Sequence, residues 1–300
     1  MQACPTELHS FICQLAGLDD GRTVRALSLV SKYFNEIARL YMYQSLSISG
    51  PEQIMILLSK LESLPLHLRQ IRHLFLSDQP FSKPEGKLRI PSPTLDPSAI
   101  TRILALVAHT LETLTFVLSD VTTSTRSIAR LFRLSFPRLR ELAVSGFYPF
   151  PSSPGKFPRL THLHLHGNRN PHGLLQLRGL DETCPSLTHL RVSGLSMAVN
   201  FAQELQEAFS GDEETMELFP SRLPPHVEHV IVQPGSPAGK LSTVALQKEE
   251  AMVQQLAAVR LLATKGVRFD VLEGSDVGPF TEAFKREWVD RLEGGQGGWA

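Results

Sequence analysis

Histidines alternate with leucines at one point of the chain. His162, His164 and His166 are separated by Leu163 and Leu165. On a β-strand this alternation places the three imidazoles on one face and both leucines in the core. Imidazole is a common metal ligand and titrates near neutral pH, so the pattern allows a metal site or a pH-sensitive binding surface.

The segment around His162 recurs elsewhere in the chain, and the position of His162 is occupied there by His73, His189 and His229. Neighbouring strands of a sheet lie about 4.8 Å apart, so histidines at equivalent positions would form a column across the strands. Glu141 interrupts this column of histidines, and no pair of cysteines lies beside it. We therefore expect a partner-contacting surface and no dedicated metal site. The residues expected on this surface, the concave face of the predicted fold, are His73, Phe75, Glu141, His162, His164, His166, His189, Arg191, His229 and Ile231.

The segment that carries these histidines recurs along the chain. Phe157-Pro-Arg-Leu-Thr-His-Leu-His-Leu-His-Gly-Asn has a counterpart beginning at Phe136 and another beginning at Cys184. The central apolar residue recurs at intervals of 28, 21 and 27 residues through Leu114, Leu142, Leu163 and Leu190. These intervals fall in the range of about 20–29 residues that is typical of leucine-rich repeats. Wider intervals on either side require insertions, which we expect at 77–97 and 211–225.

Helical patterns fill the intervals between the predicted strands, at about 98–110, 124–134, 173–182, 198–209 and 242–264. This alternation predicts an α/β fold over residues 49–293, an irregular leucine-rich-repeat solenoid with a parallel sheet. A last helix, with Phe280, Phe284, Trp288 and Leu292 on one side, is expected to cover the exposed end of the solenoid. The glycine-rich residues 294–300 are expected to form a flexible tail.

Residues 1–48 have a different pattern and predict a separate helical domain, here called the head. Three short helices are expected within residues 5–46, and in the first of them Leu8, Phe11, Ile12 and Leu15 form one apolar stripe. A domain of about 40 residues is near the limit at which a single core suffices. We therefore expect the head to depend on the rest of the chain, on a partner, or on both.

Two sequences in the head resemble an F-box. Cys4-Pro-Thr-Glu-Leu8 and Leu27-Ser-Leu-Val-Ser-Lys-Tyr-Phe34 are similar to the Leu-Pro-x-Glu-Leu and Leu-x-x-Val-Ser-Lys-x-Phe patterns of that family. The repeats that follow resemble those of fungal F-box/leucine-rich-repeat proteins. Cys4 stands where the family usually has leucine, at a position that packs on the adaptor.

The resemblance implies a non-catalytic role. An F-box binds the Skp adaptor, and through it the cullin, of a ubiquitin ligase, while the repeat domain holds an unidentified protein substrate. The residues that match apolar positions of the family, and are expected at the adaptor or in the three-helix core, are Pro5, Leu8, Ile12, Leu27, Val30 and Phe34. The alternative is a repeat-based scaffold whose F-box-like head only covers the N-terminal end of the solenoid.

Composition and motifs exclude other classes of protein. The 300 residues include 30 Lys+Arg and 30 Asp+Glu, so the broad basic charge of a nucleic-acid-binding protein is absent. No signal peptide or membrane span is expected, and three dispersed cysteines favour a reducing cytosolic or nuclear location. The stretch Gly235–Lys240 differs from a P-loop because it lacks a spacer residue and the following Ser/Thr. We expect no cofactor and no enzymatic activity.

Overall fold

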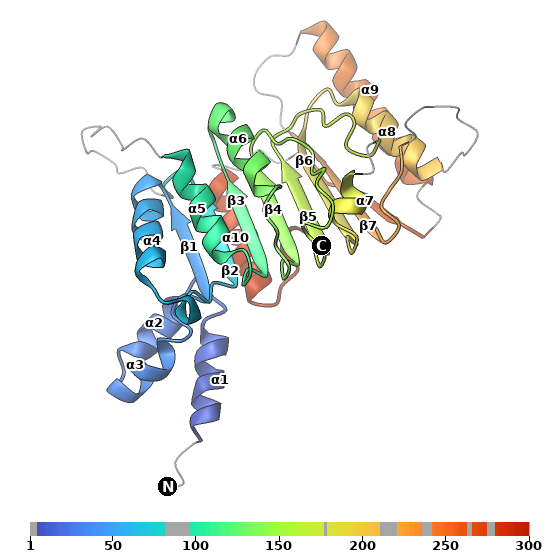
Figure 1. Ribbon diagram of the computed structural model, residues 1–300. Coiled ribbons are helices and arrows are strands. Elements are labelled where there is room, and N and C mark those ends of the chain that lie inside the picture. The colour runs from blue at the N-terminus through green and yellow to red at the C-terminus, as the bar shows by residue number, and fades with distance from the viewer. Residues whose placement is uncertain are drawn as a thin grey trace. The chain divides into compact units, whose positions relative to one another are not determined.

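The computed structural model describes residues 5–81, 96–176, 179–210, 221–235, 242–262, 266–274 and 280–299 (Figure 1). The chain divides into two compact units, unit 1 (1–119 and 278–300) and unit 2 (120–277). Each unit is α/β, with parallel strands that lie side by side in chain order. The predicted α/β class with parallel strands is therefore confirmed. Cys4 lies outside the described residues, as do most of the predicted insertions at 77–97 and 211–225.

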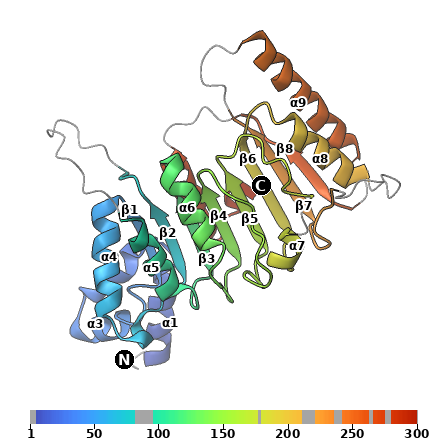
Figure 2. The same cartoon turned by 45° about the horizontal axis from the view of Figure 1, so that its top comes forward.

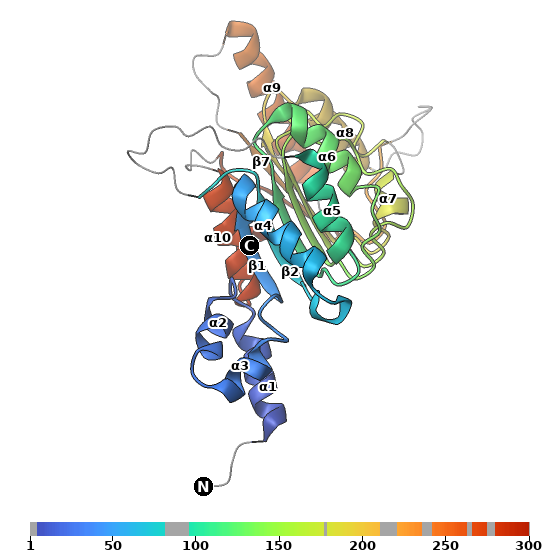
Figure 3. The same ribbon diagram turned by 60° about the vertical axis from the view of Figure 1, so that its left-hand side comes forward.

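Unit 1 begins with the three head helices and continues into three strands. Its elements are α1 (Thr6–Ala16), α2 (Arg22–Ser28), α3 (Lys32–Ala38), β1 (Ser45–Ser49), α4 (Pro51–Ser63), η1 (Leu66–Leu68), β2 (His73–Ser77), α5 (Pro97–Val107), β3 (Thr113–Val117), α10 (Phe280–Leu292) and η2 (Gly297–Trp299). The in-register leucines Leu46, Leu74 and Leu114 are buried on one face of the strands. Helices α4 and α5 cover this face, and α10 lies on the opposite one (Figure 3).

Strand β1 was not expected from the sequence. Ser45–Ser49 alternates serine with Leu46 and Ile48, which is a period of two, and it pairs in parallel with His73–Ser77. The main-chain N–H groups of Arg72 and His73 both donate to the carbonyl oxygen of Gln44, at 2.9 Å each. Six residues separate the end of α3 in the head from the first strand.

The position of α10 differs from the prediction. The helix contacts β2 and β3 in unit 1, where the sequence predicts a helix that covers the end of the repeats after the last strand. Aromatic packing explains this placement, because the Trp288 and Phe75 rings lie 5.9 Å apart between centroids. The segment after α10 is also folded, since Gly297 donates its N–H to Asp290 at 2.7 Å, where the sequence predicts a flexible tail.

Unit 2 has five strands and four helices among its described residues. They are α6 (Val121–Leu131), β4 (Glu141–Ser145), β5 (His162–His166), α7 (Gly179–Thr183), β6 (His189–Leu195), α8 (Val199–Ser210), β7 (His229–Pro234), α9 (Thr243–Leu262) and β8 (Arg268–Val271). Helices α8 and α9 pack side by side (Figure 2). Helix α7 is shorter than predicted, because residues 172–176 form turns.

The repeated sequence corresponds to a repeated structure in unit 2. The Phe136 and Phe157 rings, from equivalent positions, stack at 5.5 Å and 7°, and Cys184 at the next equivalent position is also buried. A main-chain hydrogen-bond pattern repeats as well, because Thr161 and His162 donate to one carbonyl oxygen, that of Arg140. Successive sequence segments thus occupy equivalent places along the strands.

A glycine follows β5 because the chain there approaches another main chain closely. Gly167 has a φ of 105°, and a Cβ at this position would lie 2.6 Å from the carbonyl oxygen of Gly146. A larger residue would be both strained and in collision. Gly167 is therefore required by the close packing of its turn against Gly146.

Candidate functional site

The apolar stripe of α1 faces away from the interior of the head. Leu8, Phe11, Ile12 and Leu15 are each about half exposed, with Leu8 at 51% and Phe11 at 55%. We call these four residues the α1 stripe. The residue of α1 that is buried is Cys13, which lies on the other side of the helix. The more apolar face of α1 is therefore the one left outside.

The interior of the head is small. Its buried residues are Cys13, Val24, Ile37 and Ala38, with Leu27, Phe34 and Tyr41 packed against them. Polar contacts complete the packing, because the Ser10 and Tyr41 hydroxyls lie 2.8 Å apart and the His9 ring lies 3.0 Å from the Tyr33 hydroxyl. This core closes without any side chain of the α1 stripe.

The six residues matched to the F-box pattern divide into two groups. Pro5, Leu8, Ile12 and Val30 are exposed, with Val30 at 67%. Leu27 and Phe34 belong instead to the head interior, so they support the fold of the three helices. Sequence reasoning did not include Leu29 among the candidates, although it is 85% exposed next to Val30.

The expected partner-binding face in unit 1 is covered. Phe75 is fully buried because its ring packs against Trp288 of α10 and against Phe81, at centroid distances of 5.9 and 5.5 Å. His73 is 8% exposed, and its Nδ1 lies 3.1 Å from the Thr113 hydroxyl. The prediction that Phe75 and His73 are open to a partner is therefore wrong for this state of the protein. The sequence shows the four-residue spacing of aromatics in α10 but not which strands this helix covers.

The histidine face of unit 2 is made of the same-side residues of strands β4 to β8. Its first row brings together His162, His189 and His229, with the first two rings stacked at 4.2 Å and the last two in an edge contact at 5.7 Å. The row continues from Glu141, which is in register with His162. At the other end of the row, His229 Nε2 lies 2.8 Å from Asp270 Oδ2. Three of the four histidines predicted for the column share this row, whereas His73 lies in unit 1.

The second row of the histidine face is buried. His164, Arg191 and Ile231 are in register and are 4%, 5% and 0% exposed. Because they are enclosed, they do not form the open contact surface that was expected of them. His162, His166 and His189 are partly exposed.

Burial changes the titration of His164 and His166. The loss of solvent and the nearby Arg191 guanidinium lower the pKa of His166 to about 4, and they hold the pKa of His164 well below its usual range. Both rings lie close to the Ser193 hydroxyl, at 2.7 Å from His164 Nε2 and 3.0 Å from His166 Nδ1. These two histidines are therefore neutral at physiological pH. Among the described residues, no group of three or more His, Cys, Asp or Glu side chains has the geometry of a metal site.

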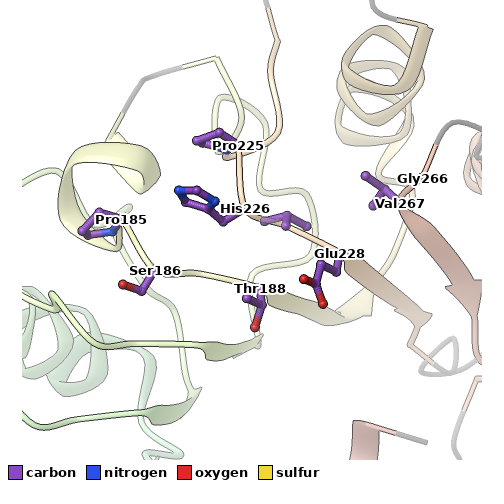
Figure 4. Close-up of a pocket in the computed structure, with 9 residues that line it drawn as sticks. Pro185, Ser186, Thr188, Pro225, His226, Glu228, Gly266 and Val267 are labelled. Carbon is purple, nitrogen blue, oxygen red and sulfur yellow. The ribbon is translucent and has the colours of Figure 1, made fainter.

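A hollow of about 630 Å³ lies where the chain enters β6, β7 and β8 (Figure 4). Its polar lining includes Ser186, Thr188, His226 and Glu228. The Ser186 and Thr188 hydroxyls donate to the carbonyl oxygens of Pro158 and Thr161, at 2.8 and 3.0 Å. Both hydroxyls thus contact the main chain, and the Thr188 hydroxyl also lies 2.8 Å from His189 Nδ1.

The chain matches no protein-family model, no curated protein sequence and no solved structure. Along the described ranges, no helix is both long and apolar enough to cross a membrane.

Proposed function

We propose that the protein is an F-box-type substrate receptor, in which the head binds a Skp-type adaptor and the repeat body binds a protein target. The observation that carries the proposal is the outward-facing α1 stripe. A helix normally buries its more apolar side, whereas α1 buries the side with Cys13 and exposes Leu8 and Ile12. An exposed apolar surface of this kind is typical of a protein interface.

The head sequence supports the same proposal. The exposed residues Pro5, Leu8 and Val30 belong to the segments that resemble the F-box, and a three-helix core lies behind them. In this role the protein carries no catalytic group. It raises the local concentration of a target beside the ubiquitin-conjugating enzyme, as linked binding sites do.

The test is co-purification of the full-length chain with a Skp adaptor. The double variant Leu8→Asp with Val30→Asp places two charges on the exposed surface of the head, and we expect it to lose the adaptor. The matched control is Leu66→Asp with Leu261→Asp, because these leucines are 78% and 80% exposed outside the head. Circular dichroism checks that both double variants are folded.

Adaptor retention by the folded Leu8→Asp, Val30→Asp variant would contradict the proposal. That outcome would instead favour a repeat-based scaffold without a ubiquitin-ligase role. Loss of the adaptor from both double variants would also count against it, since the effect would then not depend on the head.

A further inference from the structure

Helix α10 occupies a strand face that its place in the sequence does not predict. It follows β8 of unit 2 in the chain, yet it packs in unit 1 against β2 and β3. In the leucine-rich-repeat fold expected from the sequence, this is the concave face, opposite the helices α4 and α5 (Figure 3). The concave face, on which a repeat fold would bind a partner, is thus covered in unit 1 by the protein's own last helix.

The contact is built on apolar side chains one turn apart. Phe284, Trp288 and Leu292 are buried at intervals of four residues, which places them on one side of α10. On the sheet side, Phe75 is flanked in register by two small residues, Ser47 and Thr115. The small side chains on either side of Phe75 leave room for a second large ring, and the Trp288 ring packs there against Phe75.

The polar groups in and beside this contact are poorly matched. The indole N–H of Trp288 is buried and makes no hydrogen bond to a described protein atom, and the same holds for the hydroxyls of Ser45 and Ser47. A buried polar group without a partner destabilises the packing around it. The opposite face of the same strands carries the leucine row and has no such mismatch at Leu46, Leu74 and Leu114. The face covered by α10 therefore includes buried polar groups without partners, whereas the leucine row on the other face has no polar side-chain group.

A basic residue connects α10 to the head. The Lys285 ammonium lies 3.6 Å from Asp20 in the loop between α1 and α2, and 4.3 Å from the centre of the Phe81 ring. The segment after α10 is tied to the helix itself, through the Gly295 and Gly297 N–H groups and Asp290. Helix α10 and this segment thus form one piece, which can leave the sheet without breaking its own hydrogen bonds.

We propose that α10 is a displaceable cover over a helix-binding surface formed by β2 and β3. The partner that this surface fits is an amphipathic helix with aromatic residues four positions apart and a basic residue next to the first, as in Phe284, Lys285 and Trp288. The partner replaces α10 on Phe75 and takes over its contact with Asp20. This inference goes beyond the adaptor role and does not depend on it.

Hydrogen exchange of the full-length protein tests whether the cover opens. We expect the main-chain amides of α10 to exchange at least ten-fold faster than those of β2 and β3. Trp288→Ala should increase the rate in α10 further, whereas Arg286→Ala, an exposed position of the same helix, should leave it unchanged. Equal exchange rates in α10 and the two strands of the wild type would overturn the proposal.

A labelled peptide of residues 280–299 tests the uncovered surface. The tethered helix competes at high effective concentration, so the peptide should bind full-length Trp288→Ala at least ten-fold more tightly than the wild type. A peptide that carries Trp288→Ala serves as the control and should not bind. If the variant does not fold, Leu292→Ala provides the same test with a smaller change. Absence of peptide binding to a folded variant would overturn the proposal.

Discussion

Regularly spaced apolar side chains are exposed on the head and buried in unit 2. Leu8 and Ile12 of the head are 51% and 47% exposed, whereas Leu163 and Leu165 of unit 2 are fully buried. Both pairs belong to regular apolar patterns, one with the period of a helix and one with the period of a strand. The pattern tells which residues share a face, and the neighbouring elements decide whether that face is covered. In the head, a core built around Cys13 and Ile37 already closes without the α1 stripe.

Truncation of a unit 2 leucine should give the largest effect. Leu165→Ala removes a fully buried side chain, and we expect a loss of about 2–5 kcal/mol in the free energy of unfolding, because a cavity remains. Urea denaturation monitored by circular dichroism measures it. A loss below about 1 kcal/mol would mean that unit 2 is as loosely packed at this point as the head surface.

A buried carboxylate should give the next largest effect. Glu204 in α8 accepts hydrogen bonds from the main-chain N–H groups of Gly173 and Leu175 and lies 2.5 Å from His172 Nδ1. Glu204→Ala leaves the buried N–H of Leu175 and the partly buried N–H of Gly173 without their acceptor. We therefore expect a loss of about 1–3 kcal/mol in the free energy of unfolding, measured by urea denaturation. The matched control is Asn200→Ala, at an exposed position of the same helix. A loss no larger than in that control would show that residues 172–176 do not need this anchor.

The same residue should make the stability depend on pH. Burial raises the pKa of the Glu204 carboxyl above its usual value. The stabilisation that follows is therefore complete below the pKa of the unfolded chain, about 4.3, and is lost as the pH rises through the folded-state pKa. Wild-type protein should lose stability relative to Glu204→Gln as the pH is raised from about 4. A parallel pH dependence of the two proteins would contradict this prediction.

A glycine substitution should separate close packing from backbone strain. Gly21 and Gly155 both have positive φ, at 82° and 67°, but only at Gly21 would a Cβ lie near a main-chain atom, 2.8 Å from the Ser45 carbonyl oxygen. Gly155→Ala should cost about 1 kcal/mol from the left-handed backbone alone. Gly21→Ala should cost about 1 kcal/mol more, measured by thermal or urea unfolding. Equal losses of stability in the two variants would show that the close approach of Gly21 to Ser45 of β1 does not limit the side chain at this position.

Truncation in the α1 stripe should have the smallest effect on stability. Leu8→Ala removes a half-exposed side chain, so we expect a change within about 0.5 kcal/mol in the free energy of unfolding. A loss similar to that of Leu165→Ala would remove the difference between the two regions from which the adaptor-binding proposal is drawn.

The sequence predicted most of the elements because their patterns are local. The leucine alternation of the repeated segments identified the strands at 141–145, 162–166 and 189–195, and helical periodicity identified α5, α6, α8 and α9. Strand β1 was not predicted because three of its five residues are serine and it directly follows a helical region. The match of six head residues to the F-box pattern did not separate core from surface, since Leu27 and Ile12 have the same apolar character. The covering of Phe75 by α10 joins positions 213 residues apart, and no local pattern records such a contact.

The fusion of the head to β1 sets a limit on how this protein can be taken apart. Only residues 39–44 separate α3 from β1, and Gln44 holds both the head, through Gln14, and the second strand, through Arg72. An excised head that ends at residue 48 would carry most of a strand stripped of its neighbour, with an open edge that invites aggregation. A separately produced head should therefore keep β1 together with its pairing partner β2.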